Sequence, residues 1–240
     1  MIKIRAFRAI DDITSCEKYA EGHIQVLKSY NIPIIKSAST EWFFNPDVYV
    51  LSVEDESGKI VGGAKIHVAN LKFQLPVEIS LSPIDCNISE FVKSNIHNGI
   101  GEMCGLWNAK EVTGKGYSVL LTEACVAEAG IALAYKLKLQ SLFVLCAPWT
   151  TKIVEDVGFE KEVRVGNQGT FPYPKPDLLA TLYVIEDIEQ LKKAAPMSRS
   201  RIIDLRQKPK QKRVERYKDY NLEIEYDLIV ENWKQKINYE

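Results

Sequence analysis

The chain has 240 residues, of which 46% are apolar and 26% are charged, and its net charge at pH 7 is −1. This composition is typical of a globular protein, and a charge near zero gives no basis for attraction to nucleic acid or to an anionic membrane. The sequence contains no run of about 18 or more apolar residues that could span a membrane, and no signal peptide precedes its first strand pattern. We therefore expect a cytoplasmic protein.

The cysteines and histidines show no pattern of a disulfide framework or a metal site. The five cysteines are odd in number and scattered, which indicates free thiols in a reducing compartment. The three histidines lack ligand spacing with one another and with cysteine, so no metal is expected. These residues are Cys16, Cys86, Cys104, Cys125, Cys146, His23, His67 and His97.

The N-terminal part of the chain predicts a strand, two helices and a hairpin. Residues 2–7 alternate as a strand does, and Asp12 is a suitable cap for a helix that follows. A second helix is expected through Ile24, Leu27 and Tyr30, ended by Pro33. Residues 47–53 and 60–68 then form a predicted β-hairpin around an Asp/Gly turn.

The middle of the chain predicts alternating strands and helices. Residues 71–98 are irregular, with a short helix expected near Ser89. Residues 100–107 read as a strand, residues 116–138 as a long helix of period about 3.6, and residues 141–146 as a strand buried on both faces. A short helix stops at Gly158. Strands from Val163 and at 180–185 flank a proline-rich loop.

The last fifty residues change in composition. Residues 199–218 hold nine Lys/Arg and two acidic residues, and residues 219–240 hold six acidic residues and two lysines. Residues 220–226 alternate as a strand does. We interpret residues 191–240 as a charged C-terminal extension, a solvated linker with a closing strand or helix, after a domain at 1–190. A nucleic-acid-binding arm is the alternative, but no aromatic residues interleave with the charges, so nucleic acid is not an expected partner.

The segment KEVTGKGYS, residues 110–118, joins the strand at 100–107 to the long helix. The first turn of a helix has unpaired N–H groups and a partial positive charge, and glycines let an anion approach the backbone. The dinucleotide-binding pattern fails because Val119 replaces its third glycine. The P-loop pattern also fails, since Gly114-Lys115-Gly116 does not supply its Gly-Lys-Ser/Thr ending. A site for the pyrophosphate of coenzyme A remains.

At this junction the chain resembles the GNAT family of acyl-CoA N-acyltransferases, whose motif reads Gln/Arg-x-x-Gly-x-Gly/Ala. Residues 111–116 occupy those places, Gly158-Phe159 matches a later mark of the family, and the element order fits from residue 1 to about 185. The resemblance implies an α+β fold with a central mixed, mostly antiparallel sheet flanked by helices. It implies acetyl-CoA or a longer acyl-CoA as donor and a primary amine, on a small molecule or a peptide, as acceptor. The expected coenzyme A-binding residues are Leu106, Trp107, Val112, Thr113, Gly114, Lys115, Gly116, Tyr117 and Ser118.

Three positions depart from the family pattern. Glu111 replaces the usual Gln or Arg, which places a negative charge near a phosphate that Lys110 and Lys115 are expected to offset. Ala147 replaces an Asn after the fifth strand. Val154 replaces the Tyr that usually protonates the departing thiolate, and Thr150, Thr151 or a water could take its place. These departures motivate an alternative, a non-catalytic acyl-CoA-binding sensor.

Glu102 is the candidate catalytic residue, because amine acylation requires a general base and family members often carry a Glu in this strand. The alternative is a carboxylate that pairs structurally. Cys104 shares its strand face and reads as a small buried hydrophobe.

A second resemblance concerns residues 102–106, which look like the Glu-x-Ser-Arg-Phe strand of the acyl-homoserine-lactone synthases. Gly105 replaces the arginine of that strand, so lactone synthesis is not expected.

The acceptor is expected to bind at residues 31–46 and 166–178. The aromatic run at 42–44 could line the acceptor site, pack in the core or form a homodimer contact.

Overall fold

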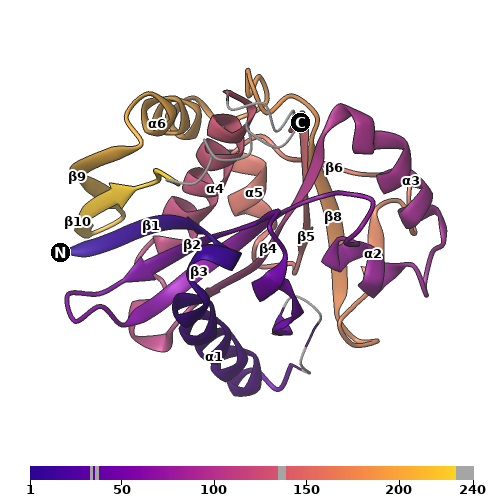
Figure 1. Cartoon of the computed structure of the whole chain (residues 1–240), viewed down its shortest axis with the longest axis horizontal. Helices are drawn as coiled ribbons and strands as arrows, with labels where there is room; N and C mark the ends of the chain where they lie inside the picture. Colours follow the sequence, from indigo (N-terminus) through magenta and orange to yellow (C-terminus); the bar gives the residue numbers. More distant parts are fainter. Residues whose placement is uncertain (33–34, 36–37, 135–138, 231–240) are drawn as a thin grey trace.

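One ten-stranded sheet forms the centre of the computed structural model, which describes residues 1–32, 35, 38–134 and 139–230. The strand order is β6-β8-β5-β4-β3-β2-β1-β10-β9, with β7 paired to β8 beside this path (Figure 1). All paired strands are antiparallel except β4–β5 and β1–β10, which are parallel. The strands are β1 (Ile2–Arg8), β2 (Val48–Glu54), β3 (Ile60–Val68), β4 (Ile100–Asn108), β5 (Ser141–Cys146), β6 (Glu160–Lys161), β7 (Thr170–Pro172), β8 (Leu179–Ile185), β9 (Lys210–Tyr217) and β10 (Tyr220–Asp227).

Helices cover both faces of this sheet, which confirms the predicted α+β class (Figure 1). On one face α4 packs on β2, β3 and β4, and α6 packs on α4. On the other face α1 packs on β3 and β4, with α2 and α3 beside it over β4 and β5. The helices are α1 (Ile13–Ser29), α2 (Pro76–Leu81), α3 (Asn87–Asn95), α4 (Tyr117–Ala134), α5 (Thr151–Asp156) and α6 (Pro196–Gln207).

The period-2 alternation of the central strands divides the core between these two faces. Ala64 and Ile66 of β3 belong to the apolar cluster under α4. Gly63 points to the other face, where a Cβ would lie 2.6 Å from the ring of Tyr19 in α1. The same alternation turns Lys65 toward α1, and it is buried there on the same face of the sheet as Glu102 and His67.

The N-terminal half follows the prediction with two differences. The first strand and the hairpin β2–β3 are confirmed, and Asp12 caps α1 by accepting a 3.0 Å hydrogen bond from the Ser15 N–H. The expected second helix was wrong, because α1 continues unbroken through Leu27. Helix α2 was not predicted, although Pro76 at its first turn is a position that favours helix starts. Pro33, which was expected to end the helix, lies outside the described residues.

The central and C-terminal elements match in part. The strand expected from Val163 was wrong, because the chain turns there and pairs with β8 only before it, as β6, and after it, as β7. Strand β5 and the short helices are confirmed, and the long helix begins at Tyr117. Its expected end at 138 lies outside the described residues. The alternating segment at 220–226 is β10, as predicted, while the basic stretch before it forms α6 and β9, which joins the same sheet. The division of the chain near residue 190 stays a prediction, as do all features of residues 231–240.

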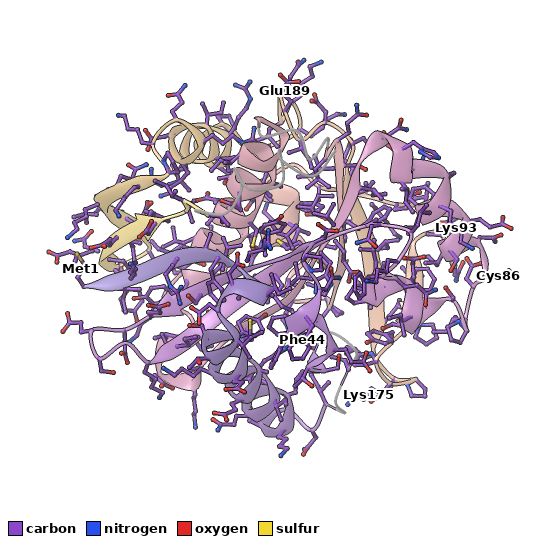
Figure 2. All side chains as sticks on the ribbon, viewed as in Figure 1. Met1, Phe44, Cys86, Lys93, Lys175 and Glu189 are labelled. Carbon is purple, nitrogen blue, oxygen red and sulfur yellow. The ribbon has the colours of Figure 1, made fainter. Side chains whose placement is uncertain are left out.

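Within the described residues no helix is long and apolar enough to cross a membrane. Over the same residues, no three His, Cys, Asp or Glu side chains come together as a metal site. All five cysteines are free thiols, with Cys86 exposed at the periphery, where Figure 2 labels it.

Candidate functional site

The parallel strands β4 and β5 separate midway along their length. Residues 100–103 of β4 pair with residues 141–144 of β5, and the pairing stops there in both of these fully described strands. The next three residues of β4, Cys104, Gly105 and Leu106, are partly exposed. The second half of β4 has therefore lost its neighbour on one side, which leaves backbone available to an extended ligand.

A β-bulge lies at the point of separation. Cys104 lies opposite Lys65 and Trp107 lies opposite Gly63, so β4 has one residue more than β3 between these two pairs. Gly105 has a φ of 63°, a left-handed conformation that favours glycine. A Cβ there would lie 2.7 Å from the hydroxyl oxygen of Tyr19, which donates a hydrogen bond to the Gly105 carbonyl. Helix α1 therefore fixes the bulge from the face opposite α4.

Two residues predicted to line the donor site, Leu106 and Trp107, point to opposite faces of β4. Leu106 is half-buried against the apolar cluster under α4. Trp107 is buried against α1, its ring stacked on His23 with centroids 6.5 Å apart. A Cβ on Gly22 would lie 2.2 Å from that ring. The Trp107 side chain therefore packs in the core, and its backbone is the part that borders the separated strands.

The glycine turn between β4 and α4 has two glycines in different surroundings. Gly114 has a φ of 81°, is exposed, and a Cβ there would meet no atom within 4 Å. Gly116 has a φ of 97° and is buried, because a Cβ there would lie 2.5 Å from Cγ of Tyr217. Gly114 thus faces open space, whereas Gly116 makes room for a side chain from β9.

The start of α4 presents free donors in this turn. The N–H groups of Gly116, Tyr117 and Ser118 donate to no acceptor within the described part of the chain. Tyr117 and Val112 are buried and anchor the turn in the core. The Ser118 hydroxyl accepts a 2.6 Å hydrogen bond from Asn108, and Thr113 donates to the Ala109 carbonyl at 3.1 Å. The turn is therefore anchored in the core, and three of its N–H groups have no acceptor among the described residues.

The charge of Glu111 is balanced by a residue that was not predicted. Its carboxylate lies 2.8 Å from Nζ of Lys59, in the turn of the β2–β3 hairpin. Hydrogen bonding to Lys59 lowers the pKa of Glu111. Nothing local in the sequence links the two residues, because the contact follows from the pairing of β3 with β4. The ion pair leaves the half-buried Lys115 as a positive charge within the turn itself.

Glu102 lies in β4 on the α1 face, opposite His67 of β3. Its side chain is 2% exposed, and Oε2 accepts a 2.8 Å hydrogen bond from the N–H of Val77 in the first turn of α2. Burial raises the pKa of Glu102 to about 8, against the opposing effects of the Val77 N–H and the charge of Lys65. A carboxyl group with this pKa exchanges protons near neutral pH, as a general base must.

A buried lysine stands beside this carboxyl group. Lys65 is opposite Cys104 in the register, so it shares a face with Glu102. Its ammonium lies 4.0 Å from the ring centroid of Trp42 and 5.5 Å from that of Tyr19, and burial lowers its pKa to about 8. The sequence signal for it was available, because Lys65 interrupts an otherwise apolar strand at a position that faces the helix.

Two histidines border the same face and are neutral at pH 7. Burial lowers the pKa of His23 to about 3 and the pKa of His67 well below its usual value, and the positive charge of Lys65 adds to both shifts. Nδ1 of His23 and Nε2 of His67 have no hydrogen-bond partner among the described residues. Burial likewise raises the pKa of Cys104, which makes its thiol inert as a nucleophile at neutral pH.

The segment after β5 holds the residues considered as proton donors to a leaving thiolate. The hydroxyl of Thr150 donates to the Ala147 carbonyl at 2.9 Å, and that of Thr151 donates to the Pro148 carbonyl at 3.1 Å. Both hydroxyls therefore serve the backbone at the start of α5. Val154 is buried in the core. Nearby, the Tyr183 hydroxyl donates to Glu155 at 3.0 Å on the α4 side of the sheet.

The aromatic run before β2 divides between core and surface. Trp42 and Phe43 are buried in the cluster with Tyr19 and Trp107, whereas Phe44 is 67% exposed and is labelled in Figure 2. The ring of Trp42 thus covers the ammonium of Lys65, so Trp42 lies beside the buried polar residues of the α1 face.

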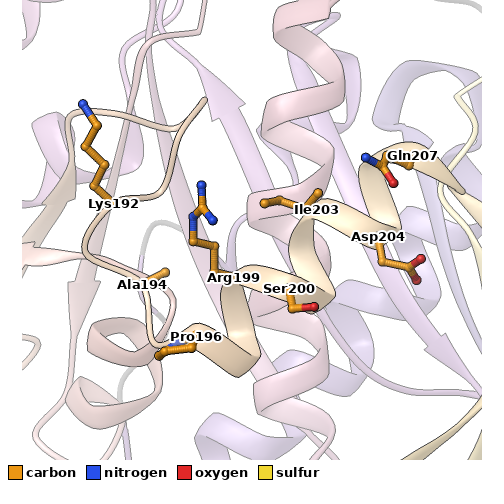
Figure 3. A pocket seen from close by; sticks show the side chains of 8 residues that line it. All are labelled: Lys192, Ala194, Pro196, Arg199, Ser200, Ile203, Asp204 and Gln207. Carbon is orange, nitrogen blue, oxygen red and sulfur yellow. The ribbon is translucent and has the colours of Figure 1, made fainter.

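Two surface cavities lie away from these residues. One, of about 780 Å³, runs along α6 (Figure 3). The other, of about 170 Å³, lies between α3 and the start of β5. None of the residues predicted for donor binding lines either cavity. The residues of the first are Lys192, Ala194, Pro196, Arg199, Ser200, Ile203, Asp204 and Gln207.

Comparison with known proteins places this geometry in a fold class. No family and no curated protein matches the sequence. Among solved structures, the chain is similar to FeeM, an N-acyl amino acid synthase from uncultured soil microbes, with a TM-score of 0.56 and 10% identity over 76% of this chain and 95% of that one. It is similar to an acyl-CoA N-acyltransferase from Pseudomonas aeruginosa, with a TM-score of 0.52 and 11% identity over 77% and 99%.

A third similar structure is BjaI, a CoA-dependent acyl-homoserine lactone synthase, with a TM-score of 0.51 and 12% identity over 85% of this chain and 89% of that one. The neighbours are GNAT-fold proteins, and the chain therefore has the GNAT fold. The fold class inferred from the glycine turn and the element order is confirmed.

Proposed function

We propose that this protein is an acyl-CoA-dependent N-acyltransferase that moves an acetyl or longer acyl group from coenzyme A to a primary amine. The observation that carries the proposal is the junction of β4 and α4. There a strand that has parted from β5 leads into a glycine turn with three free amides at the start of a long helix. Such amides bind phosphate, and an unpaired strand edge can hydrogen-bond an extended arm.

The donor would lie along β4 and across the turn. Residues 112–118 would receive the pyrophosphate through the amides of Gly116, Tyr117 and Ser118, with Lys115 supplying positive charge. Gly114 would allow close approach, since no atom stands within 4 Å of its Cβ position. The backbone at Leu106 and Trp107 would accompany the pantetheine arm and bring the thioester to the bulge at Gly105.

Glu102 is the residue we assign as general base, directly or through a water. The amine nitrogen would attack the thioester carbon while one proton passes to the carboxylate, and a strand N–H would polarise the carbonyl oxygen. The carbon–sulfur bond would then break, and the thiolate would take up a proton from water. A thiolate is a good leaving group, so the chemistry tolerates Val154 in place of a tyrosine acid.

The same fold could bind acyl-CoA without turnover, as a sensor. The neighbours are described as transferases and synthases, which favours the enzyme. An assay for free coenzyme A thiol in the presence of an amine distinguishes the enzyme from the sensor, because a sensor releases no thiol. We further propose that residues 1–190 carry the transferase domain and that it works in the cytoplasm.

Thermal unfolding with coenzyme A, acetyl-CoA and longer acyl-CoAs tests the donor. A ligand at about 100 times its Kd adds roughly 2.7 kcal/mol, which should raise Tm by about 5–10 °C. The Gly114→Val variant should lose this shift, since its side chain would stand where the phosphates approach. A wild-type chain that shows no shift with any coenzyme A ester would overturn the proposal.

The chain offers a matched control for that variant. Gly58, in the β2–β3 turn, has a φ of 80° and also has no atom within 4 Å of its Cβ position. Gly58→Val therefore carries the same backbone strain as Gly114→Val. It should lower the basal Tm similarly and keep the full shift with acyl-CoA.

A further inference from the structure

Tyr217, at the end of β9, lies directly on the glycine turn. A Cβ on Gly116 would be 2.5 Å from Cγ of Tyr217 and 2.8 Å from its Cβ, which is closer than real Cβ contacts. The φ of Gly116, 97°, is also one that other residues rarely adopt. The ring of Tyr217 therefore occupies the space that the missing side chain leaves, and Gly116 is buried beneath it.

The β9–β10 hairpin that carries this ring is anchored at its base. Strand β10 pairs in parallel with β1, from Ile2 opposite Ile224 to Arg5 opposite Asp227. The Tyr226 hydroxyl donates to Glu215 at 2.9 Å between the two hairpin strands. These contacts make the hairpin part of the main sheet. They therefore hold Tyr217, at the end of β9, against the glycine turn.

A second set of contacts ties the hairpin to the helix that follows the glycine turn. Arg201 of α6 lies 3.5 Å from Glu123 of α4 and 3.5 Å from Glu215 of β9. Arg206 of α6 donates to the Val126 carbonyl of α4 at 3.0 Å. Turn, helix and hairpin are thus held as one unit, and Tyr217 is the part of it that touches the turn.

The chain is longer than the part that it shares with two of these similar structures. The FeeM and Pseudomonas aeruginosa structures are covered over 95% and 99% of their lengths, but over only 76% and 77% of this chain. About a quarter of this chain is therefore additional to what those proteins share with it. The hairpin places residues of the predicted C-terminal extension against the predicted donor site.

We propose that Tyr217 is a positioning residue for the acyl-CoA donor. Its ring braces Gly116 and so keeps the amides of residues 116–118 directed outward toward the pyrophosphate. The inference rests on the proposed function, because it assigns the C-terminal hairpin a part in that same site. It predicts that the extension sets donor affinity without taking part in the chemical step.

Kinetics of Tyr217→Ala test the proposal. The variant should raise KM for acetyl-CoA and Kd for coenzyme A by about tenfold, with kcat close to wild type, because the turn loses its brace while Glu102 is untouched. A role in folding alone would lower the active fraction, and hence kcat, with KM unchanged. The control is Tyr220→Ala, whose side chain stands opposite Tyr217 in the hairpin but is 44% exposed.

A double-mutant cycle keeps the test decisive if the single variant is unstable. Gly116→Ala alone should weaken coenzyme A binding because its Cβ collides with the ring. In the Tyr217→Ala background the same change should weaken binding less, since the ring is gone. Additive effects, or unchanged affinity in Tyr217→Ala, would overturn the inference while leaving the proposed function intact. A wild-type chain that binds no coenzyme A would overturn both.

Discussion

The hydroxyl of Tyr19 in α1 donates a hydrogen bond to the carbonyl oxygen of Gly105 in β4, 86 residues later in the chain. The contact joins the first helix to the bulge at which β4 leaves β5. Tyr19 is fully buried and its ring also stands edge-on to Trp42 and Trp107. One side chain thus connects the packing of the α1 face to the shape of the candidate thioester site.

Removing that hydroxyl tests how much the contact stabilises the fold. Tyr19→Phe should lower the free energy of unfolding by about 1–2 kcal/mol, because the Gly105 carbonyl loses its partner in a buried setting. Tm should fall by about 2–8 °C in thermal unfolding. Tyr30→Phe, at the exposed end of the same helix, is the matched control and should leave Tm unchanged. Equal Tm values for Tyr19→Phe and wild type would contradict this account.

The buried histidines predict a loss of stability in mild acid. His23 has a pKa of about 3 in the folded chain, so between about pH 3 and 6.5 the unfolded chain binds a proton that the folded chain does not. The free energy of unfolding should therefore fall by about 2 kcal/mol from this residue between pH 7 and pH 5. His67 adds to the fall in the same direction.

Urea unfolding of His23→Gln at the two pH values measures this contribution. The variant should lose about 2 kcal/mol of the pH dependence, whatever its stability at pH 7. His97→Gln, which changes an exposed histidine, should keep the wild-type dependence. A slope for His23→Gln equal to that of wild type would show that His23 is protonated in the folded chain.

The raised pKa of Glu102 predicts the pH profile of the reaction. The carboxylate is the active form of a base, so kcat/KM should rise with pH and level off above about pH 8. Glu102→Gln should lower kcat by a factor of about 100 or more while still accepting the Val77 hydrogen bond. Acetyl-CoA turnover with an amine acceptor at pH 6–9 gives both results. A flat profile in wild type would remove Glu102 from this role.

Stability provides a second measure of the same group without any need for activity. The folded chain holds the Glu102 proton up to about pH 8, whereas the unfolded chain releases it near its ordinary value. Between these values the folded state binds more protons, so this group makes the free energy of unfolding fall as pH rises. Glu102→Gln should flatten that part of the curve.

The positive charge of Lys65 should shift the pH profile of kcat/KM. Its attraction lowers the pKa of Glu102, so Lys65→Met should move the midpoint of kcat/KM above pH 8. Removing Lys65 also leaves the buried Glu102 without its positive neighbour, so the Tm of the variant is measured beside the profile to confirm that it is folded. Lys152→Met, which removes an exposed lysine, should leave the midpoint in place. A midpoint that moves toward acid in Lys65→Met would contradict the sign of this interaction.

The sequence was informative where structure follows from local pattern. Alternation predicted β1 and β10, an Asp/Gly turn predicted the β2–β3 hairpin, and a continuous apolar run predicted β5. The glycines at 114 and 116 predicted the turn into α4, because backbone conformation is encoded locally. The same logic could have drawn attention to Lys65, since a lysine at an inward position of a strand must be buried with it. Glu102 was found because amine acylation requires a base and the resembled family often carries a Glu in this strand.

Contacts between distant segments could not be predicted in this way. The pairing of Glu111 with Lys59 and the packing of Tyr217 on Gly116 depend on which strands become neighbours. The sequence explained Gly116 by an approaching phosphate, and the structure adds a ring from β9 at the same glycine. The basic segment before β10 also formed a helix and a strand, because pairing with β10 and packing on α4 supply stability that its charge pattern did not reveal.

The parallel pairing of β1 with β10 has a consequence for the order in which the molecule can be made. Strand β1 leaves the ribosome well before β10, and the neighbour on its outer edge is complete only when residue 227 has been added. Throughout synthesis that edge exposes unpaired backbone groups beside β2. Completion of the sheet, and with it the packing of Tyr217 on the glycine turn, must therefore follow the synthesis of β10.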